Sequence, residues 1–151
     1  MRVVFGEPEA GWLPVSISCD TGNLSFDASD IYPSLEMLIT SLHALLLANE
    51  ARTMIWNLEP AEYEFQFARN AENITLIVWE YADSRRSQSD GNLRLTTVCS
   101  YAQAALPFWR AIRGLQGRYN ESEWQGRWSR EFPVKSLEQW TLSLREQGLI
   151  A

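Results

Sequence analysis

Hydrophobic and polar positions alternate with a period of two along much of the first hundred residues. Apolar side chains occupy every second position from 13 to 19 and again from 24 to 28, and the turn-forming stretch 20–23 separates the two runs. Successive side chains of a β-strand point to opposite faces, so this alternation is typical of a strand buried on one side. It predicts a hairpin, preceded by a short apolar strand at 2–5.

Four more strands are predicted at 52–59, 62–69, 73–81 and 93–100. The turns between the first three are short, and short turns join antiparallel neighbours. The segment 83–92 is polar, and we expect it to be a flexible loop. The aromatic residues of the second of these strands are predicted to point inward, in a register that pairs Tyr63 with Leu58, Phe65 with Trp56 and Val78, and Phe67 with Leu76.

Helical periodicity is found in three segments. Leucine and isoleucine recur with the 3.6 period over 34–49, after Asp30 or Ser34 as the capping residue. A second helix is predicted over 101–115, kinked or restarted at Pro107. A last helix begins at Ser136, where Ser-Leu-Glu-Gln fits a capping box. The stretch 120–132 between them is expected to be irregular or a short helix.

Together these elements predict a single α+β domain over 1–151. Its expected architecture is an antiparallel meander of about six to seven strands, packed by the helix at about 34–49 on one face. The two C-terminal helices are expected across the other face or one end. A chain of 151 residues with 46% apolar content can form a core of its own.

No segment has the pattern of a membrane span. The longest apolar stretch, 42–48, is interrupted by a histidine and is far too short to cross a bilayer. The first residues lack the long apolar run of a secretory signal. From these two features we expect a cytoplasmic protein that does not bind membranes.

Charge is divided unevenly along the chain. Residues 1–83 hold thirteen acids and three bases, whereas 84–151 hold six acids and ten bases, and the net charge is −6. An acidic first half and a basic second half can complement each other within the molecule, or they can form two surfaces for different partners.

Catalytic, metal and cofactor motifs are missing from the sequence. His43 is the sole histidine, and it lies beside the apolar side of its predicted helix, which favours a structural role. Cys19 and Cys99 are in phase with core positions, so we expect both to be buried, reduced thiols. We therefore predict no catalytic residues, no metal site and no cofactor.

Two features remain open to other functions. Glu59, Glu62, Glu64 and Glu80 lie on neighbouring predicted strands, and paired carboxylates can hydrolyse glycosides. The stretch 108–132 mixes arginines with aromatic residues, a combination that can bind single-stranded nucleic acid. The acidic net charge and the absence of a nucleic-acid motif argue against nucleic acid as a partner.

The predicted register places carboxylates beside aromatic residues on the face opposite the inward-pointing aromatic residues. Aromatic residues inside a charged surround are typical of a binding hot spot. The alternative is that the C-terminal helices cover this face and that Arg110, Arg113 or Arg118 pairs with its carboxylates. The proposed partner-binding residues are Glu59, Glu62, Glu64, Trp79 and Tyr81.

These features favour a non-catalytic protein-binding module. In its acidic, Trp-rich composition without catalytic motifs, the chain is similar to bacterial immunity proteins, which neutralise secreted toxins. We therefore expect an immunity- or inhibitor-type function and a basic protein partner. The alternative is a small-ligand binder, for example of carbohydrate, or a carboxylate-dependent hydrolase with a Trp- and Glu-lined cleft. The sequence leaves open whether the chain is a monomer or a homodimer.

Overall fold

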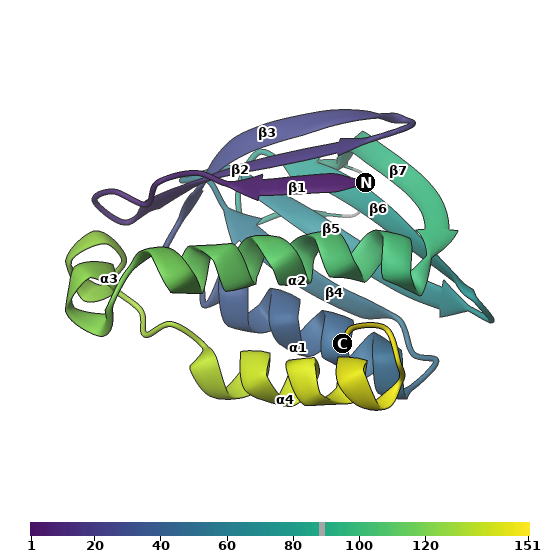
Figure 1. Ribbon diagram of the computed structural model, residues 1–151. Helices are drawn as coiled ribbons and strands as arrows, with labels where there is room; N and C mark the ends of the chain where they lie inside the picture. Colours follow the sequence, from purple (N-terminus) through teal and green to yellow (C-terminus); the bar gives the residue numbers. More distant parts are fainter. Residues whose placement is uncertain (88–89) are drawn as a thin grey trace.

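The part of the chain that the structure describes contains seven strands and four α-helices (Figure 1). The computed structural model describes residues 1–87 and 90–151, so 88–89 of the predicted loop 83–92 lie outside the described residues. The elements are β1 (Arg2–Phe5), β2 (Trp12–Cys19), β3 (Gly22–Ser29), α1 (Ser34–Leu47), β4 (Arg52–Asn57), β5 (Glu62–Asn70), β6 (Asn73–Tyr81), β7 (Asn92–Ser100), α2 (Tyr101–Arg118), α3 (Glu121–Arg127) and α4 (Val134–Glu146). The predicted α+β class is confirmed.

All seven strands form one antiparallel sheet, and their order in the sheet follows their order in the chain. The predicted register between β5 and β6 is confirmed, because Phe65 lies opposite Val78 and Phe67 lies opposite Leu76. The inward alternation is confirmed as well, since Phe65 and Phe67 are buried. Inward-pointing residues therefore define one buried face, called here the inner face.

The predicted register between β4 and β5 is wrong by two residues. Trp56 lies opposite Tyr63, whereas the sequence pattern had paired Tyr63 with Leu58. The strand ends early because the side-chain oxygen of Asn57 accepts a hydrogen bond from the backbone N–H of Glu59, which starts the turn. A shift of two residues leaves every side chain on its predicted face.

The sheet bends sharply between β3 and β4. These two strands share a single pair of opposed residues, Ser29 and Asn57. The turn that joins β2 to β3 reaches β7, where the Thr21 hydroxyl donates to the carbonyl of Thr96 at 2.6 Å. The inner face is therefore concave, and Phe26 of β3 contacts Trp56 of β4 within it, with ring centroids 5.7 Å apart.

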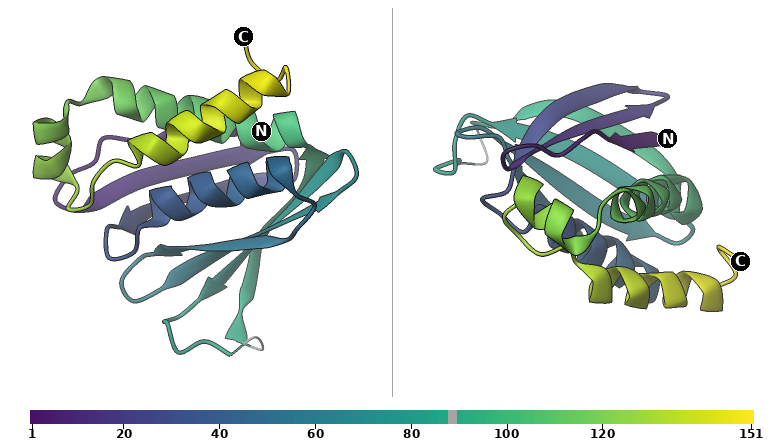
Figure 2. Two further views of the ribbon diagram at one scale, coloured as in Figure 1. Left: turned by 90° about the horizontal axis from the view of Figure 1, so that it is seen from below. Right: turned by 60° about the vertical axis from the view of Figure 1, so that its left-hand side comes forward.

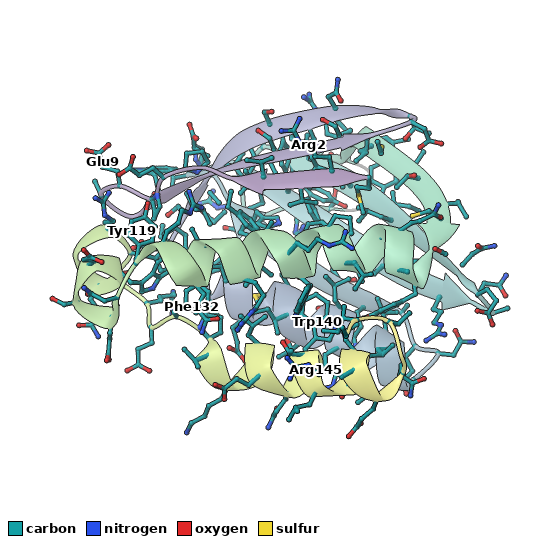
Figure 3. All side chains as sticks on the ribbon, viewed as in Figure 1. Arg2, Glu9, Tyr119, Phe132, Trp140 and Arg145 are labelled. Atoms are coloured by element: carbon teal, nitrogen blue, oxygen red, sulfur yellow. The ribbon has the colours of Figure 1, made fainter. Side chains whose placement is uncertain are left out.

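The C-terminal helices lie on the same face as α1, whereas the sequence pattern predicted them across the other face or at one end (Figure 2). Phe108 of α2 contacts the inward Phe67, with ring centroids 6.4 Å apart. The Tyr101 hydroxyl of α2 donates to the carbonyl of Leu42 in α1 and accepts from the indole N–H of Trp140, which lies between α4 and α2 (Figure 3). One concave face can bury several apolar helices, so the opposite face needs no cover.

The helix ends differ from the predicted ones. Helix α2 runs through Pro107 to Arg118, three residues beyond its predicted end. Helix α4 begins at Val134 and has no side-chain cap. Ser136, predicted to cap it, lies inside the helix and donates to the carboxylate of Glu36 instead. The Ser136 hydroxyl thus joins α4 to α1, in place of the capping bond that the sequence predicts at the start of α4.

His43 and the cysteines have no shared site. The His43 ring lies 2.9 Å from the Ser143 hydroxyl, joining α1 to α4, and burial lowers the pKa of this histidine. Both cysteines are free thiols, as expected, but they are half-buried and not buried. Cys19 is the last residue of β2, Cys99 is the last but one of β7, and both are partly buried against the core. Burial still raises the pKa of Cys99.

Candidate functional site

The face of the sheet opposite the helices, called here the outer face, carries four of the five predicted partner-binding residues, and the fifth, Glu59, lies in the turn after β4. The side chains of the outer face form rows across the strands. Glu64 lies opposite Trp79, and Glu62 lies opposite Tyr81, so these four residues are cross-strand neighbours. The rows continue to Ile55 of β4 and to Leu93 of β7. The sequence thus placed these four residues together correctly.

Arg86, which follows β6, folds back onto the outer face. One guanidinium nitrogen lies 2.7 Å from a carboxylate oxygen of Glu64, in an ion pair without hydrogen-bond geometry. Its Nε lies 3.5 Å from Glu62, and its guanidinium carbon lies 4.6 Å from the centroid of the Tyr81 ring. A guanidinium over an aromatic face and beside carboxylates is stabilised by both.

Tyr32 completes this group, and we name the five residues Tyr32, Glu62, Glu64, Tyr81 and Arg86 the outer-face cluster. The Tyr32 hydroxyl donates to Glu62 at 2.7 Å. This hydrogen bond, together with burial and the negative charge of Glu62, raises the pKa of Tyr32. The Glu62 side chain is only 2% exposed. Its charge is met by a cation and a hydroxyl, as buried carboxylates require.

The five predicted site residues therefore differ in how accessible their side chains are to a partner. Glu62 and Tyr81 are buried, while Glu64 and Trp79 are half-buried. Glu59 is exposed in the turn after β4 and lines a shallow hollow of about 440 Å³ with Asn57 and Asp83. Only Glu59, Glu64 and Trp79 present surface to a partner.

Arg86 is the residue that the sequence reasoning missed. The alternative had given the carboxylates Arg110, Arg113 or Arg118 from the C-terminal helices. Arg113 instead contacts Gln116 within α2, and Arg118 donates to backbone carbonyls of β1 and the residue after it. The available signal was position: only three residues separate the pair Arg85–Arg86 from the end of β6, so an arginine there can reach the outward side chains of that strand.

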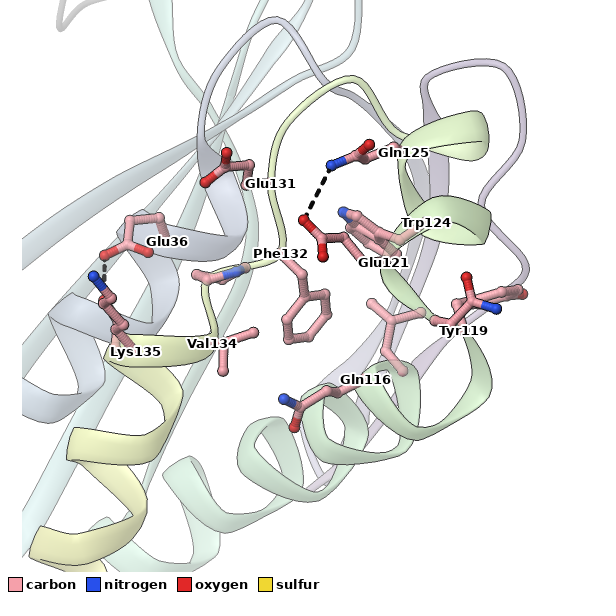
Figure 4. Close-up of a pocket in the computed structure, with 14 residues that line it drawn as sticks. Glu36, Gln116, Tyr119, Glu121, Trp124, Gln125, Glu131, Phe132, Val134 and Lys135 are labelled. Atoms are coloured by element: carbon pink, nitrogen blue, oxygen red, sulfur yellow. Dashed lines mark hydrogen bonds between the residues drawn. The ribbon is translucent and has the colours of Figure 1, made fainter.

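A second concave region lies among the helices, between the end of α2, helix α3 and the start of α4 (Figure 4). We call it the helical pocket, and its volume is about 660 Å³. This size is within the range of small-molecule sites. Its lining consists of Glu36, Leu115, Gln116, Tyr119, Asn120, Glu121, Trp124, Gln125, Glu131, Phe132, Pro133, Val134, Lys135 and Ser136.

The chain builds this pocket by wrapping 119–133 around one tryptophan. Asn120 and Glu123 cap α3 reciprocally, which fixes the start of this short helix. The Trp124 indole N–H donates to the carbonyl of Arg130 at 2.8 Å, and the Phe132 ring packs edge-on against it at 5.0 Å. The chain then enters α4 at Val134. The pocket floor is thus aromatic and held in place on both sides.

Charged and amide side chains surround that floor. Glu36, Glu121 and Glu131 contribute three carboxylates, and Lys135 contributes one cation. Gln125 donates to Glu121 at 3.4 Å, a contact marked in Figure 4. The sequence reasoning did not identify this pocket, because its residues come from four elements with no shared motif.

Within residues 1–87 and 90–151, no group of three or more His, Cys, Asp or Glu side chains is placed to hold a metal ion. In the same part of the chain, no helix combines the length and the apolar character needed to cross a membrane. No protein-family model matches this chain, and comparisons with curated proteins and with solved structures find no match.

Proposed function

We propose that this protein is a non-catalytic protein-binding module whose outer face receives a basic protein partner, in the manner of an immunity- or inhibitor-type protein. The observation that supports this most strongly is an apolar strip on the outer face, bordered by carboxylates and left open by the helices. The strip consists of Ile77 and Trp79 on β6 and Leu93 and Val98 on β7.

The apolar strip has the exposure expected of a contact surface. Leu93 is 54% exposed and Val98 is 60% exposed, while Ile77 and Trp79 are half-buried. All four lie on two neighbouring strands, so a partner can cover them together. Removing apolar surface from water on binding contributes about 25 cal/mol for each Å². Tryptophan is enriched among hot-spot residues, and Trp79 lies beside Leu93 at one end of this strip.

The charge beside the strip favours a basic partner. Glu59 and Asp83 are exposed at one end of the outer face, and Glu64 lies next to Trp79. Arg86 shows that a guanidinium is stable on this face between a carboxylate and an aromatic ring. A net charge of −6 adds long-range attraction for a cationic partner, which raises the rate of association at low salt.

The outer-face carboxylates offer little support for hydrolase chemistry. Glu62 is held by Tyr32 and Arg86, and Glu64 accepts from the amide of Gln66 at 2.6 Å. A general acid or a nucleophile has to reach its substrate. The carboxylates of this cluster are occupied by the protein itself.

Two equally exposed leucines on opposite sides of the molecule provide a matched test. Leu93 lies on the outer face and is 54% exposed, whereas Leu142 lies on α4 and is 56% exposed. We expect Leu93→Lys to weaken binding of the natural partner at least tenfold, because it places a cation where a basic surface docks. Leu142→Lys changes the net charge equally and should leave binding unchanged.

The measurement begins with affinity capture from cells of the source organism using the wild type, Leu93→Lys and Leu142→Lys, followed by calorimetry on the purified pair. A basic partner that is lost with Leu93→Lys alone, and whose affinity falls as salt rises, supports the proposal. A partner retained by Leu93→Lys, lost equally with Leu142→Lys, or acidic in character overturns it. Thermal unfolding of both variants checks that they are folded.

A further inference from the structure

We infer that the helical pocket binds a small organic cation, an ammonium or guanidinium group on a short apolar stem. The pocket joins an aromatic floor to a carboxylate-rich rim, and these two parts match the two ends of such a ligand. Phe132 and Leu115 offer apolar surface to the stem, while Glu121 and Glu131 offer negative charge to the head group. The inference is independent of partner binding at the outer face.

The charged side chains that line the pocket favour a positively charged ligand. Three carboxylates and one ammonium group line it, so the lining carries a net negative charge. Among the residues that the structure describes, neither Glu121 nor Glu131 forms an ion pair. Arg118 and Arg127, which flank Tyr119, do not line the pocket, and Arg127 is paired with Glu7. A cation therefore finds unneutralised carboxylates here.

Other ligand classes fit the pocket less well. A sugar is held largely by stacking on an open aromatic face, but Trp124 is only 3% exposed, and its ring is enclosed by Phe132 and Trp128. An anion would meet Lys135 only by approaching carboxylates as well. The outer face of the same protein already holds a guanidinium by a carboxylate and an aromatic ring, since Arg86 contacts Glu64 and the Tyr81 ring.

The cationic group could belong to a free small molecule or to an arginine side chain of another protein. Three probes separate these sources. N-butylguanidine represents the free cation, N-acetylarginine N-methylamide adds the surrounding backbone, and N-acetylcitrulline N-methylamide is the uncharged analogue. Tighter binding of the arginine probe than of butylguanidine indicates a protein side chain, and equal binding indicates a free cation.

Titration of ¹⁵N-labelled protein, followed by amide chemical shifts, locates the binding. Both cationic probes should shift the amides of Gln116, Glu121 and Lys135 in a saturable way, and the citrulline probe should not. Equal shifts with the citrulline probe overturn the inference, because the carboxylates then play no part. Absence of saturable shifts at the pocket with either cation overturns it as well.

A matched pair of double variants tests the role of charge. Glu121→Gln with Glu131→Gln removes two exposed pocket carboxylates, and Glu138→Gln with Glu146→Gln removes two exposed carboxylates of α4 outside the pocket lining. The first should weaken binding of the arginine probe at least fivefold, and the second should change it less than twofold. Equal effects would show only general electrostatic attraction and would contradict a pocket site.

Discussion

The outer-face cluster and the helical pocket are both acidic and aromatic, but they differ in the source of their cation. In the outer-face cluster, Arg86 lies 2.7 Å from Glu64 and 4.6 Å from the centre of the Tyr81 ring. In the helical pocket, the carboxylates of Glu121 and Glu131 have no such arginine within the described chain. The outer-face cluster is therefore closed by the Arg86 side chain. The carboxylates of the helical pocket remain open to a cation from another molecule.

This difference shows that acidic residues in a sequence do not identify a binding site. A buried carboxylate without a partner costs several kcal/mol, so Glu62 requires a cation or donors wherever it lies. Exposed carboxylates carry no such cost, and they can remain unpaired until a ligand arrives. The degree of burial therefore separates a structural cluster from a site that can bind.

The largest expected effect comes from opening the outer-face cluster. Arg86→Ala leaves Glu62 and Glu64 without their cation, and the Glu62 side chain is 2% exposed. We expect the free energy of unfolding to fall by about 2 kcal/mol in urea denaturation. Arg94→Ala is the control, because the Arg94–Glu80 pair is more exposed and should contribute less than about 1 kcal/mol. Equal losses in the two variants would contradict a closed cluster.

A smaller effect is expected at the hydroxyl that supports Glu62. Tyr32→Phe removes the 2.7 Å hydrogen bond to Glu62, and we expect the free energy of unfolding to fall by about 1 kcal/mol. This value is at the low end for a bond to a charged acceptor, because Tyr32 is only half-buried. The pKa of Tyr32 is raised in the native state above its ordinary 10.0. The stabilisation is therefore complete below pH 10 and is lost as pH rises further.

Urea denaturation of the wild type and Tyr32→Phe at pH 8 and pH 10.5 measures this dependence. The difference between the two proteins should be smaller at the higher pH. A difference that grows with pH would mean that the hydroxyl ionises more readily in the folded protein, and the described hydrogen bond would then be wrong.

The smallest effect on stability is expected in the helical pocket. Glu131→Gln removes an exposed carboxylate that lies among other carboxylates and has no ion-pair partner in the described chain. The free energy of unfolding should change by less than about 0.5 kcal/mol, toward greater stability if at all. A loss near that of Arg86→Ala, measured under the same conditions, would show that the pocket carboxylates are structural and would remove the contrast with the outer-face cluster.

Much of the fold could be predicted because local patterns determine it. Period-two alternation located the strands, and even-numbered turns placed Glu62, Glu64, Trp79 and Tyr81 on one face. The position of α2 could not be predicted this way, since an amphipathic helix is compatible with either side of a sheet. The choice depends on the bend between β3 and β4, which has no local signal.

The site was less predictable than the fold for a related reason. The pairing of Glu62 with Arg86 depends on how the segment after β6 folds back, and periodicity says nothing about a polar loop. The helical pocket depends on the packing of Phe132 against Trp124 and on the unexpected start of α4 at Val134. Such tertiary contacts join residues from several elements, so no regular spacing in the sequence identifies them.

A single titration tests the contrast between the two regions most directly. N-butylguanidine is added to ¹⁵N-labelled wild type and to Arg86→Ala, and amide shifts are followed in both regions. In the wild type, saturable shifts should be confined to the helical pocket, at Gln116, Glu121 and Lys135. In Arg86→Ala, a second set should arise at Glu62, Glu64 and Tyr81, where the probe replaces the missing guanidinium. Shifts at the outer-face cluster of the wild type, or none there in Arg86→Ala, would contradict the account.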